Sequence, residues 1–192
     1  MSKLLSKITI ASVAIAAVVV GGIYLTSTSR VNKTVSSSNS AVANNNPNQA
    51  TLVSVWDKET EPNYSGTTEM TVYRSPSCGC CGIWVEHAKK HGFQIKDVKT
   101  EELEALKQKY NIPTELASCH TTIIDGYVME GHIPADDIKR FLSEKPAMAG
   151  LAVPGMPIGT PGMEAREIKQ PFQVLAFNHK GEIEVFKEYQ SY

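Results

Sequence analysis

The chain has 192 residues, a net charge of -1 and 42% hydrophobic residues, which suits one ordinary domain with appendages. Its lysines and arginines are scattered rather than clustered, and this argues against a nucleic-acid partner. Three of the four cysteines lie within residues 78–81, and the fourth, Cys119, stands beside a histidine. A framework of structural disulfides spreads its cysteines along the chain, whereas a reactive or metal-binding site gathers them. The cysteine positions therefore favour a reactive or metal-binding site.

The first residues have the pattern of a membrane segment. Lys3 and Lys7 precede an uncharged stretch at residues 8–25, which is close to the minimum length that spans a bilayer. No cleavage site of small residues follows directly, so we expect an uncleaved anchor over residues 1–26 rather than a cleaved signal peptide. Because the two lysines favour the cytoplasm, the rest of the chain is expected outside it. The predicted location is the periplasmic side of a bacterial inner membrane, or the periplasm itself if the segment is cleaved.

A polar stretch follows. Residues 27–66 are rich in Ser, Asn, Thr and Ala and show almost no apolar periodicity. Such a segment cannot bury enough surface to offset the entropy of ordering it, and we predict a flexible tether. Val53, Val55 and Trp56 could add a short docking element at its end, which the sequence does not decide.

Residues 67–145 have the alternating pattern of an α/β domain. The clearest local signal is Asp125-Gly126, which predicts a tight hairpin turn between two short strands. Pro134 is typical of the first turn of a helix. The expected order of elements, strand, helix, strand, helix, hairpin, helix, is that of the thioredoxin-like fold. The predicted elements are a strand at 70–73, a helix at 83–91, a strand at 93–98, a helix at 101–110, hairpin strands at 121–124 and 127–130, and a helix at 134–142.

Residues 146–192 form an extension that a plain thioredoxin lacks. Residues 147–162 are dense in Gly, Pro and Met and have neither a helical nor a strand period, so we expect a loop. Two strands at 172–177 and 182–187 are predicted to form a terminal β-hairpin.

The segment Cys78-Gly79-Cys80-Cys81 is predicted to lie between a strand and the start of a helix. The positive field of a helix N-terminus stabilises thiolate, which is both the nucleophile and the soft-metal ligand. Cys78 and Cys81 have the spacing of a redox-active pair, and Cys80 adds a third sulfur that a dithiol switch does not need. Thiolates can bridge two ions, so three of them can start a multinuclear Cu(I) cluster.

Three other interpretations of this segment remain open. A structural disulfide would close too small a loop to contribute much stability. Metal-free dithiol redox needs only Cys78 and Cys81. A closed zinc site would need Cys119 and His120 as its second ligand pair, and we expect the side chains of these adjacent residues to diverge. Zinc is thus the weaker metal candidate.

Cys119 and His120 lie in the turn before the third predicted strand. In thioredoxin-like folds the turn before the third strand lies against the CxxC motif and normally carries a cis-proline that receives a peptide substrate. Here that turn reads Ala117-Ser118-Cys119-His120-Thr121. A thiol and an imidazole at this place argue against a general disulfide reductase and for a captured metal.

Four motifs in order carry a resemblance to the CopG-like copper-resistance proteins over residues 70–186. The resemblance implies a thioredoxin-like fold with a C-terminal extension, a cysteine-bridged multinuclear copper cluster at the CxCC segment, and oxidoreductase handling of Cu(I) and Cu(II) in the periplasm alongside efflux systems. The motifs are Ser77-Cys78-Gly79-Cys80-Cys81, Leu116-Ala117-Ser118-Cys119-His120-Thr121, Asp125-Gly126-Tyr127 with Glu130-Gly131-His132-Ile133-Pro134, and Gly155-Met156-Pro157-Ile158-Gly159 with Pro161-Gly162-Met163-Glu164.

The resemblance suggests a metal-binding role for the methionine-rich loop at residues 147–162. Thioether is a soft neutral donor suited to Cu(I), which makes Met156 and Met163 candidate ligands, although a methionine in a loop is often a packing filler. His132 is predicted as a ligand or as a capping residue. His87 and His91, four residues apart, are expected on a solvated helix face.

The leading hypothesis is a copper-binding oxidoreductase. Cys78 and Cys81 would be the redox pair, and the predicted metal ligands are Cys78, Cys80, Cys81, Cys119, His120, His132, Met156 and Met163. The alternatives are a non-catalytic copper store or metallochaperone for an efflux system, and a metal-free thiol–disulfide oxidoreductase. The expected partners are copper ions, an efflux system or redox partner, and the membrane through the N-terminal segment.

Overall fold

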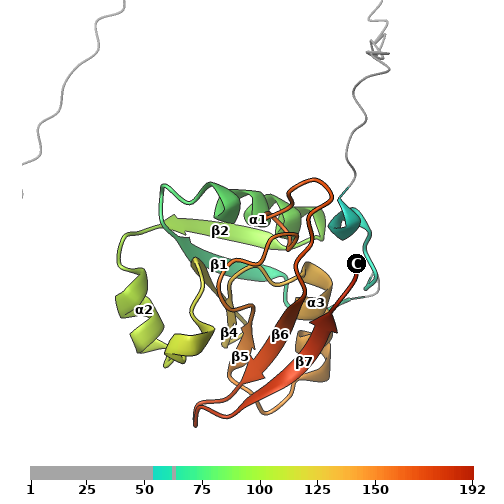
Figure 1. Ribbon diagram of the computed structural model, residues 1–192. Helices are drawn as coiled ribbons and strands as arrows, with labels where there is room; N and C mark the ends of the chain where they lie inside the picture. Colours follow the sequence, from blue (N-terminus) through green and yellow to red (C-terminus); the bar gives the residue numbers. More distant parts are fainter. Residues whose placement is uncertain (1–53, 62–63) are drawn as a thin grey trace, which may run out of the picture. The chain divides into compact units, whose positions relative to one another are not determined.

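A mixed seven-stranded sheet organises the computed structural model, which describes residues 54–61 and 64–192 (Figure 1). The predicted anchor and most of the predicted tether lie outside these residues. Within them, none of the helices combines the length and apolar character that crossing a bilayer would need. The elements are η1 (Val55–Asp57), β1 (Glu69–Arg74), α1 (Gly79–Lys90), β2 (Gln94–Lys99), α2 (Leu103–Lys109), η2 (Thr114–Leu116), β3 (His120–Ile124), β4 (Tyr127–Glu130), α3 (Ala135–Glu144), β5 (Gly150–Ala152), β6 (Phe172–Phe177) and β7 (Ile183–Tyr189).

The strand order β2-β1-β3-β4-β5-β6-β7 brings two distant segments together at one end of the sheet. Helix α1 crosses over between the parallel strands β1 and β2, so it begins where β1 ends. Strand β3 runs antiparallel to β1, with His120 opposite Arg74. The residues just before β3 therefore lie beside the start of α1.

Alternation along the strands gives the sheet two apolar faces. One face carries Met129, Leu151 and Val174 and packs against α1 and α3. The other carries Val128 and Ala152 and packs against η2 and the segment after α2. The fold is thus α/β, with helices covering both faces of the sheet.

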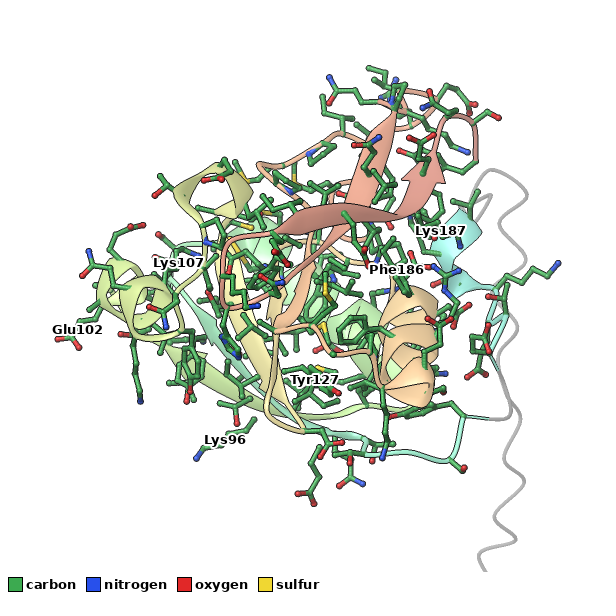
Figure 2. The ribbon with its side chains drawn as sticks, turned by 90° about the horizontal axis from the view of Figure 1, so that it is seen from below. Lys96, Glu102, Lys107, Tyr127, Phe186 and Lys187 are labelled. Atoms are coloured by element: carbon green, nitrogen blue, oxygen red, sulfur yellow. A yellow bond between two sulfur atoms is a disulfide. The ribbon has the colours of Figure 1, made fainter. Side chains whose placement is uncertain are left out.

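The face under α3 also receives aromatic side chains from the hairpin and from the last strand. Tyr127 and Phe186 each pack edge-on against Phe141 of α3, with ring centroids 5.1 and 5.8 Å away (Figure 2). Such pairs contribute beyond their buried area. The C-terminal extension is therefore joined to the first part of the domain through a common core.

Strand β5 corrects the prediction of a loop without strands at 147–162. Gly150-Leu151-Ala152 pairs parallel with β4 and antiparallel with β6, and all three residues are buried. A Cβ atom on Gly150 would lie 1.8 Å from the carbonyl oxygen of Val128, so only glycine permits this pairing. A three-residue strand buried on both faces has no alternating pattern by which the sequence could reveal it.

The docking element that the sequence left open is present. Trp56 in η1 is 8% exposed and packs against Phe172, Tyr189 and Tyr192. Its Nε1–H donates a 2.7 Å hydrogen bond to the carbonyl oxygen of Gly159. Residues that pack against the core are thus found before residue 67, the predicted first residue of the domain.

Candidate metal site

The CxCC segment forms the first turn of α1. Cys78 is the N-cap residue in an extended conformation, and Gly79 is the first helical residue. The guanidinium of Arg74 donates a 3.3 Å hydrogen bond to the Cys78 carbonyl oxygen while it pairs with Asp97 at 2.8 Å. The Arg74–Asp97 pair thus fixes the backbone of Cys78 at the N-terminus of α1, where the unpaired N–H groups of the first turn lie beside the cysteines.

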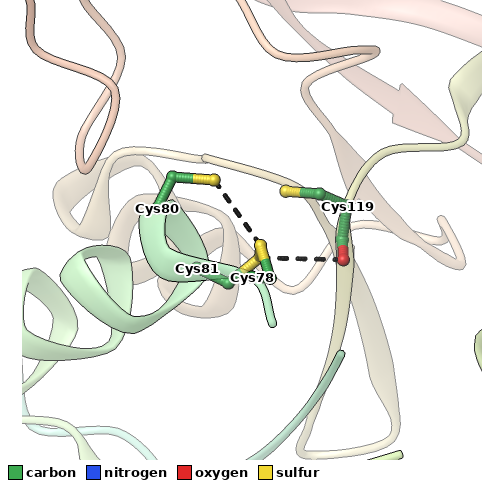
Figure 3. Close-up of side chains that lie close together, drawn as sticks. All are labelled: Cys78, Cys80, Cys81 and Cys119. Carbon is green, nitrogen blue, oxygen red and sulfur yellow. Dashed lines mark hydrogen bonds between the residues drawn. A yellow bond between two sulfur atoms is a disulfide. The ribbon is translucent and has the colours of Figure 1, made fainter. Parts of the chain in front are cut away.

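Two of the three sulfurs in this turn are bonded to each other. Cys78 and Cys81 form a disulfide, whereas Cys80 and Cys119 are free thiols. The Cys80 sulfur lies 3.5 Å from that of Cys78, and Figure 3 shows the sulfurs of Cys80 and Cys119 pointing towards each other. The structure therefore contains the oxidised form of the CxxC pair, with two thiols left beside it.

Cys119 and His120 converge, which corrects the expectation that their side chains diverge. The Cys119 sulfur is 3.5 Å from Nδ1 of His120 and 3.0 Å from Nε2 of His132. Cys119 lies in a bend just before β3, so the alternation of side chains along a strand does not apply to it. Cys119 and His120 could therefore bind the same metal ion in a closed site.

The donor atoms form two overlapping groups. The first consists of the four cysteine sulfurs, and the second consists of Cys81, Cys119, His120 and His132. Within each group all donor atoms lie within 4.8 Å of one another. Cys81 and Cys119 belong to both, which is the arrangement in which a thiolate can bridge neighbouring soft ions.

The two histidines are held in different ways. His132 is fully buried, and its Nδ1 lies 2.7 Å from the carbonyl oxygen of Pro161. That carbonyl can only accept, so Nδ1 carries the proton and Nε2 turns a lone pair towards Cys119. His120 is also fully buried, and its ring packs at a tilt against Trp84 with ring centroids 4.5 Å apart. Its Nε2 has no hydrogen-bond partner among the described residues.

Burial sets the protonation states of these groups. It lowers the pKa of His132 and lowers the pKa of His120 well below its usual value, so both imidazoles are neutral and able to coordinate. Burial, followed by the nearby Cys80, raises the pKa of the Cys119 thiol to about 12. A metal ion supplies the positive charge that converts such a thiol to a ligand. The donor set fits a soft or borderline cation.

A buried ion pair that sequence reasoning missed is hydrogen-bonded to the turn that carries Cys119. Glu130 is fully buried, pairs with Lys107 of α2, and accepts hydrogen bonds from Ser118 N at 2.7 Å and from the Thr121 hydroxyl at 2.6 Å. The available signal was its position in strand β4, where alternation places Glu130 on the same buried face as Val128.

The predicted thioether ligands lie on segments that touch the site. Met156 is 52% exposed and follows Gly155, which bridges Ser118 next to Cys119. Met163 is half-buried and follows Gly162, where an added Cβ would lie 2.8 Å from the Cys80 carbonyl oxygen. The backbone at Gly155 and Gly162 thus approaches both halves of the cysteine cluster.

His87 and His91 are buried, which contradicts the solvated face expected for them. Nε2 of His87 accepts a 3.1 Å hydrogen bond from Ala135 N. The His91 ring lies 2.6 Å from the Trp56 carbonyl oxygen and 3.1 Å from Asp136. The docking of α3 and of the Trp56 segment covers this side of α1, and periodicity within α1 could not anticipate either contact.

One family model and two solved structures match this chain, and the names of both structures refer to copper resistance. The family described as "Protein of unknown function, DUF411" matches residues 116–163, which include Cys119, His120 and His132. A solved structure named "Copper resistance protein copG- Form 1" is 38% identical, with a TM-score of 0.62, and the match covers 66% of this chain and 100% of that one. A second, "Copper resistance protein copG- Form 2", is 39% identical with a TM-score of 0.62, covering 65% and 99%. No curated protein matches the chain.

Proposed function

Because the chain belongs to the CopG-like copper-resistance family, we propose that it is a periplasmic copper-binding protein that holds a thiolate-bridged, multinuclear copper site and interconverts Cu(I) and Cu(II). One observation carries this proposal: the two donor groups share the sulfurs of Cys81 and Cys119. Copper is the substrate of this chemistry rather than a resident cofactor.

The donor set favours more than one ion. Four sulfurs and two imidazoles exceed the three or four donors that one Cu(I) or Zn²⁺ accepts. A thiolate shared by two groups lets neighbouring ions occupy both while each keeps a low coordination number. Soft sulfur donors select Cu(I), and imidazole also suits Cu(II), so the combined set accommodates both oxidation states.

Cys78 and Cys81 supply the electrons in this proposal. When two thiolates form the disulfide, one S–S bond is made and two electrons are released, which reduce two Cu(II) ions to Cu(I). In this proposal the Cys78–Cys81 disulfide is the oxidised product of that reaction. A periplasmic dithiol partner would reduce the disulfide again by exchange, with its thiolate attacking the sulfur of the half-buried Cys78 rather than that of the fully buried Cys81.

We also interpret β1 to β4 with α1 to α3 as a thioredoxin-like domain over residues 67–145, completed by the extension at 146–192. The chain order and the placement of CxxC at the start of α1 support this interpretation. The proposed periplasmic location and the membrane link rest on the pattern at residues 1–26 alone.

The disulfide favours a second candidate, a thiol–disulfide oxidoreductase that needs no metal. Cys78 and Cys81 have the spacing and helix position for it. Against it, the Cys119 thiol lies within 4.8 Å of both disulfide sulfurs, in the turn where a thioredoxin would receive its peptide substrate. Measurable reduction of a disulfide substrate by metal-free protein would support this candidate.

The test of copper binding is stoichiometry. Full-length protein, reduced and loaded with Cu(I) without oxygen, should retain more than one copper per chain by elemental analysis after removal of loosely bound metal. Cys80→Ser and Cys119→Ser should each lower that number. Ser77→Ala, which alters a neighbouring hydroxyl outside both donor groups, should not. Retention of one ion or none by the wild-type protein would refute the multinuclear site.

The thioether ligands can be tested in the same preparation. Met163→Ala should speed the loss of Cu(I) to a competing chelator, because it removes a soft donor from a segment that contacts the Cys80 turn. Met148→Ala is the matched control, since Met148 packs against the hydrophobic core. Equal rates for the two variants would remove Met163 from the proposed ligands.

A further inference from the structure

Polar contacts fasten the Trp56 segment, residues 54–61, to two helices. The Trp56 carbonyl oxygen lies 2.6 Å from Nε2 of His91, the residue that ends α1. Four residues further on, Thr60 N donates a 2.6 Å hydrogen bond to the carboxylate of Asp136 in the first turn of α3. The His91 ring also contacts Asp136, so one imidazole and one carboxylate join this segment to both helices.

Both ring nitrogens of His91 face oxygen atoms that can only accept hydrogen bonds. Nε2 faces the Trp56 carbonyl oxygen, and Nδ1 lies 3.1 Å from Oδ1 of Asp136. Although burial opposes it, the hydrogen bonds from Thr60 lower the pKa of Asp136, so this side chain is a carboxylate. A neutral imidazole has one N–H, whereas an imidazolium has two. Only the protonated ring donates to both partners at once.

Burial makes the loss of one of these protons costly. The His91 ring is 5% exposed, so water has little access to its two contacts. After deprotonation, a nitrogen lone pair faces either the Trp56 carbonyl oxygen or the Asp136 carboxylate, and that oxygen loses its donor. A buried acceptor left without a donor costs free energy, and more so when it is charged. Raising the pH therefore weakens the attachment of the Trp56 segment.

The neighbouring titratable groups leave the positive charge on His91. The His87 ring, with its centroid 4.5 Å away, accepts a hydrogen bond from the backbone of α3 through Nε2. Burial, followed by the neighbouring His91, lowers the pKa of His87 to about 3, so the two rings do not share the charge. Asp136 is thus the carboxylate that balances His91. The other acidic side chains of the segment with ion-pair partners are Asp57, paired with Lys90, and Glu59, paired with Lys139.

The indole of Trp56 connects the His91 contact to the loop at residues 159–163. Its Nε1–H donates a 2.7 Å hydrogen bond to the Gly159 carbonyl oxygen, and its rings pack against aromatic side chains of β6 and β7. Gly159 N in turn donates a 2.9 Å hydrogen bond to the Met163 carbonyl oxygen. A change in the attachment of Trp56 therefore reaches this loop.

We propose that His91 is a pH-sensitive latch, which holds the Trp56 segment against α1 and α3 while its ring carries two protons and loosens the segment when one is lost. The stabilisation is present at low pH and is lost as the pH rises. This is opposite to the effect of His87, which stabilises the fold as a neutral ring. The inference concerns the attachment of residues 54–61 and goes beyond the proposed function, since it requires no copper.

The test follows the two tryptophans of the chain by fluorine nuclear magnetic resonance in full-length protein made with fluorotryptophan. Trp56→Phe assigns the signals. Between about pH 5 and about pH 9, the range that brackets imidazole titration, the Trp56 signal should move towards its position in the unfolded protein. The ratio of attached to released segment should fall about tenfold or more, because a hydrogen bond to a charged group is lost. The fully buried Trp84, bonded to the Ile133 carbonyl oxygen, is the internal reference and should not move.

Asp136→Asn distinguishes the latch from a general effect of pH. Its amide donates to the lone pair of a neutral His91 ring, whose remaining N–H still donates to the Trp56 carbonyl oxygen, so the attached signal should persist across the pH range. His179→Ala, which removes an exposed histidine from a turn, should retain the wild-type transition. Nitrogen resonances of labelled histidine, assigned with His91→Gln, should show His91 losing a proton at the same midpoint as the Trp56 transition.

Three results would overturn the proposal. They are a Trp56 signal that stays attached while His91 loses its proton, a His91 ring that carries one proton throughout the range, and an Asp136→Asn protein that responds to pH as the wild type does. The first two need no variant other than those that assign the signals. If circular dichroism shows that Asp136→Asn does not fold, His91→Gln takes its place, and a wild-type transition in that protein is the refuting result.

Discussion

Replacing Lys107 by Met tests whether the buried ion pair behind the Cys119 turn stabilises the fold. The substitution keeps most of the length of the unbranched side chain but removes the positive charge that faces Glu130, which is fully buried. Removing one partner of a buried pair typically costs about 3 to 5 kcal/mol because the other charge is left uncompensated. Ser118 N and the Thr121 hydroxyl still donate to the carboxylate, so we expect about 3 kcal/mol, at the lower end.

Urea denaturation of the metal-free protein measures this cost. With a slope of about 2 kcal/mol per molar urea, the midpoint should fall by about 1.5 M. Lys109→Met is the matched control, because Lys109 lies on the exposed side of the same helix and should change stability by less than about 0.5 kcal/mol. The double variant Lys107→Met, Glu130→Gln should recover a large part of the loss, since no unpaired charge remains.

The cost should also depend on pH. Burial raises the pKa of Glu130, although Lys107 opposes that shift, and loss of Lys107 removes the opposition. A carboxyl group whose pKa is raised in the folded state stabilises the protein below the unfolded pKa and loses that contribution as pH rises through the folded pKa. The Lys107→Met penalty should therefore shrink as pH falls towards 4. A penalty below about 0.5 kcal/mol at pH 7, or one equally large in the double variant, would refute the reasoning.

Three further predictions concern the packing around the site. Trp56→Ala should cost about 3 to 5 kcal/mol and Trp56→Phe distinctly less in thermal or urea unfolding, because phenylalanine keeps most of the aromatic packing and loses the hydrogen bond to Gly159; equal costs would contradict the packing argument. Gly150→Ala should destabilise the protein strongly, while Gly79→Ala, where an added Cβ meets nothing within 4 Å, should not; similar melting temperatures would argue against the β4–β5 pairing. Burial lowers the pKa of His87 to about 3, so the stability it contributes above its unfolded pKa is lost as pH falls. The wild-type protein should lose about 2 kcal/mol more than His87→Gln between pH 7 and pH 5 in urea titrations, and parallel losses would show that His87 is not the group responsible.

Local sequence signals identified most of the elements because they depend on neighbouring residues. Asp125-Gly126 forms the turn between β3 and β4, with positive φ at both residues, and the residue pattern of 70–142 matches the observed alternation of strands and helices. The cysteine cluster was also visible, since Cys78, Cys80 and Cys81 must be close wherever the segment lies. The boundaries of α1 were less certain, because the helix begins at Gly79 inside the motif itself rather than after it.

Contacts between distant segments were not predictable in this way. Burial of His87 and His91 depends on the start of α3, which follows α1 in the sequence by more than forty residues, and on the Trp56 segment, which precedes it. The Lys107–Glu130 pair joins α2 to β4 across 23 residues. Strand β5 depends on the space that Gly150 leaves beside Val128. In each case the contacting residue lies too far away in the sequence to affect the local periodicity from which helices and strands are predicted.

By itself, the sequence determined that this protein gathers sulfur ligands at a helix start and has a thiol and an imidazole before a strand, because residue type and short spacing fix those facts. Only the tertiary structure decided that the two parts meet, that Cys81 and Cys119 belong to two donor groups at once, and that His132 completes the second. The reason is that β3 pairs with β1 and α1 starts where β1 ends, so the sheet, and no local pattern, brings the donors within reach of the same ions.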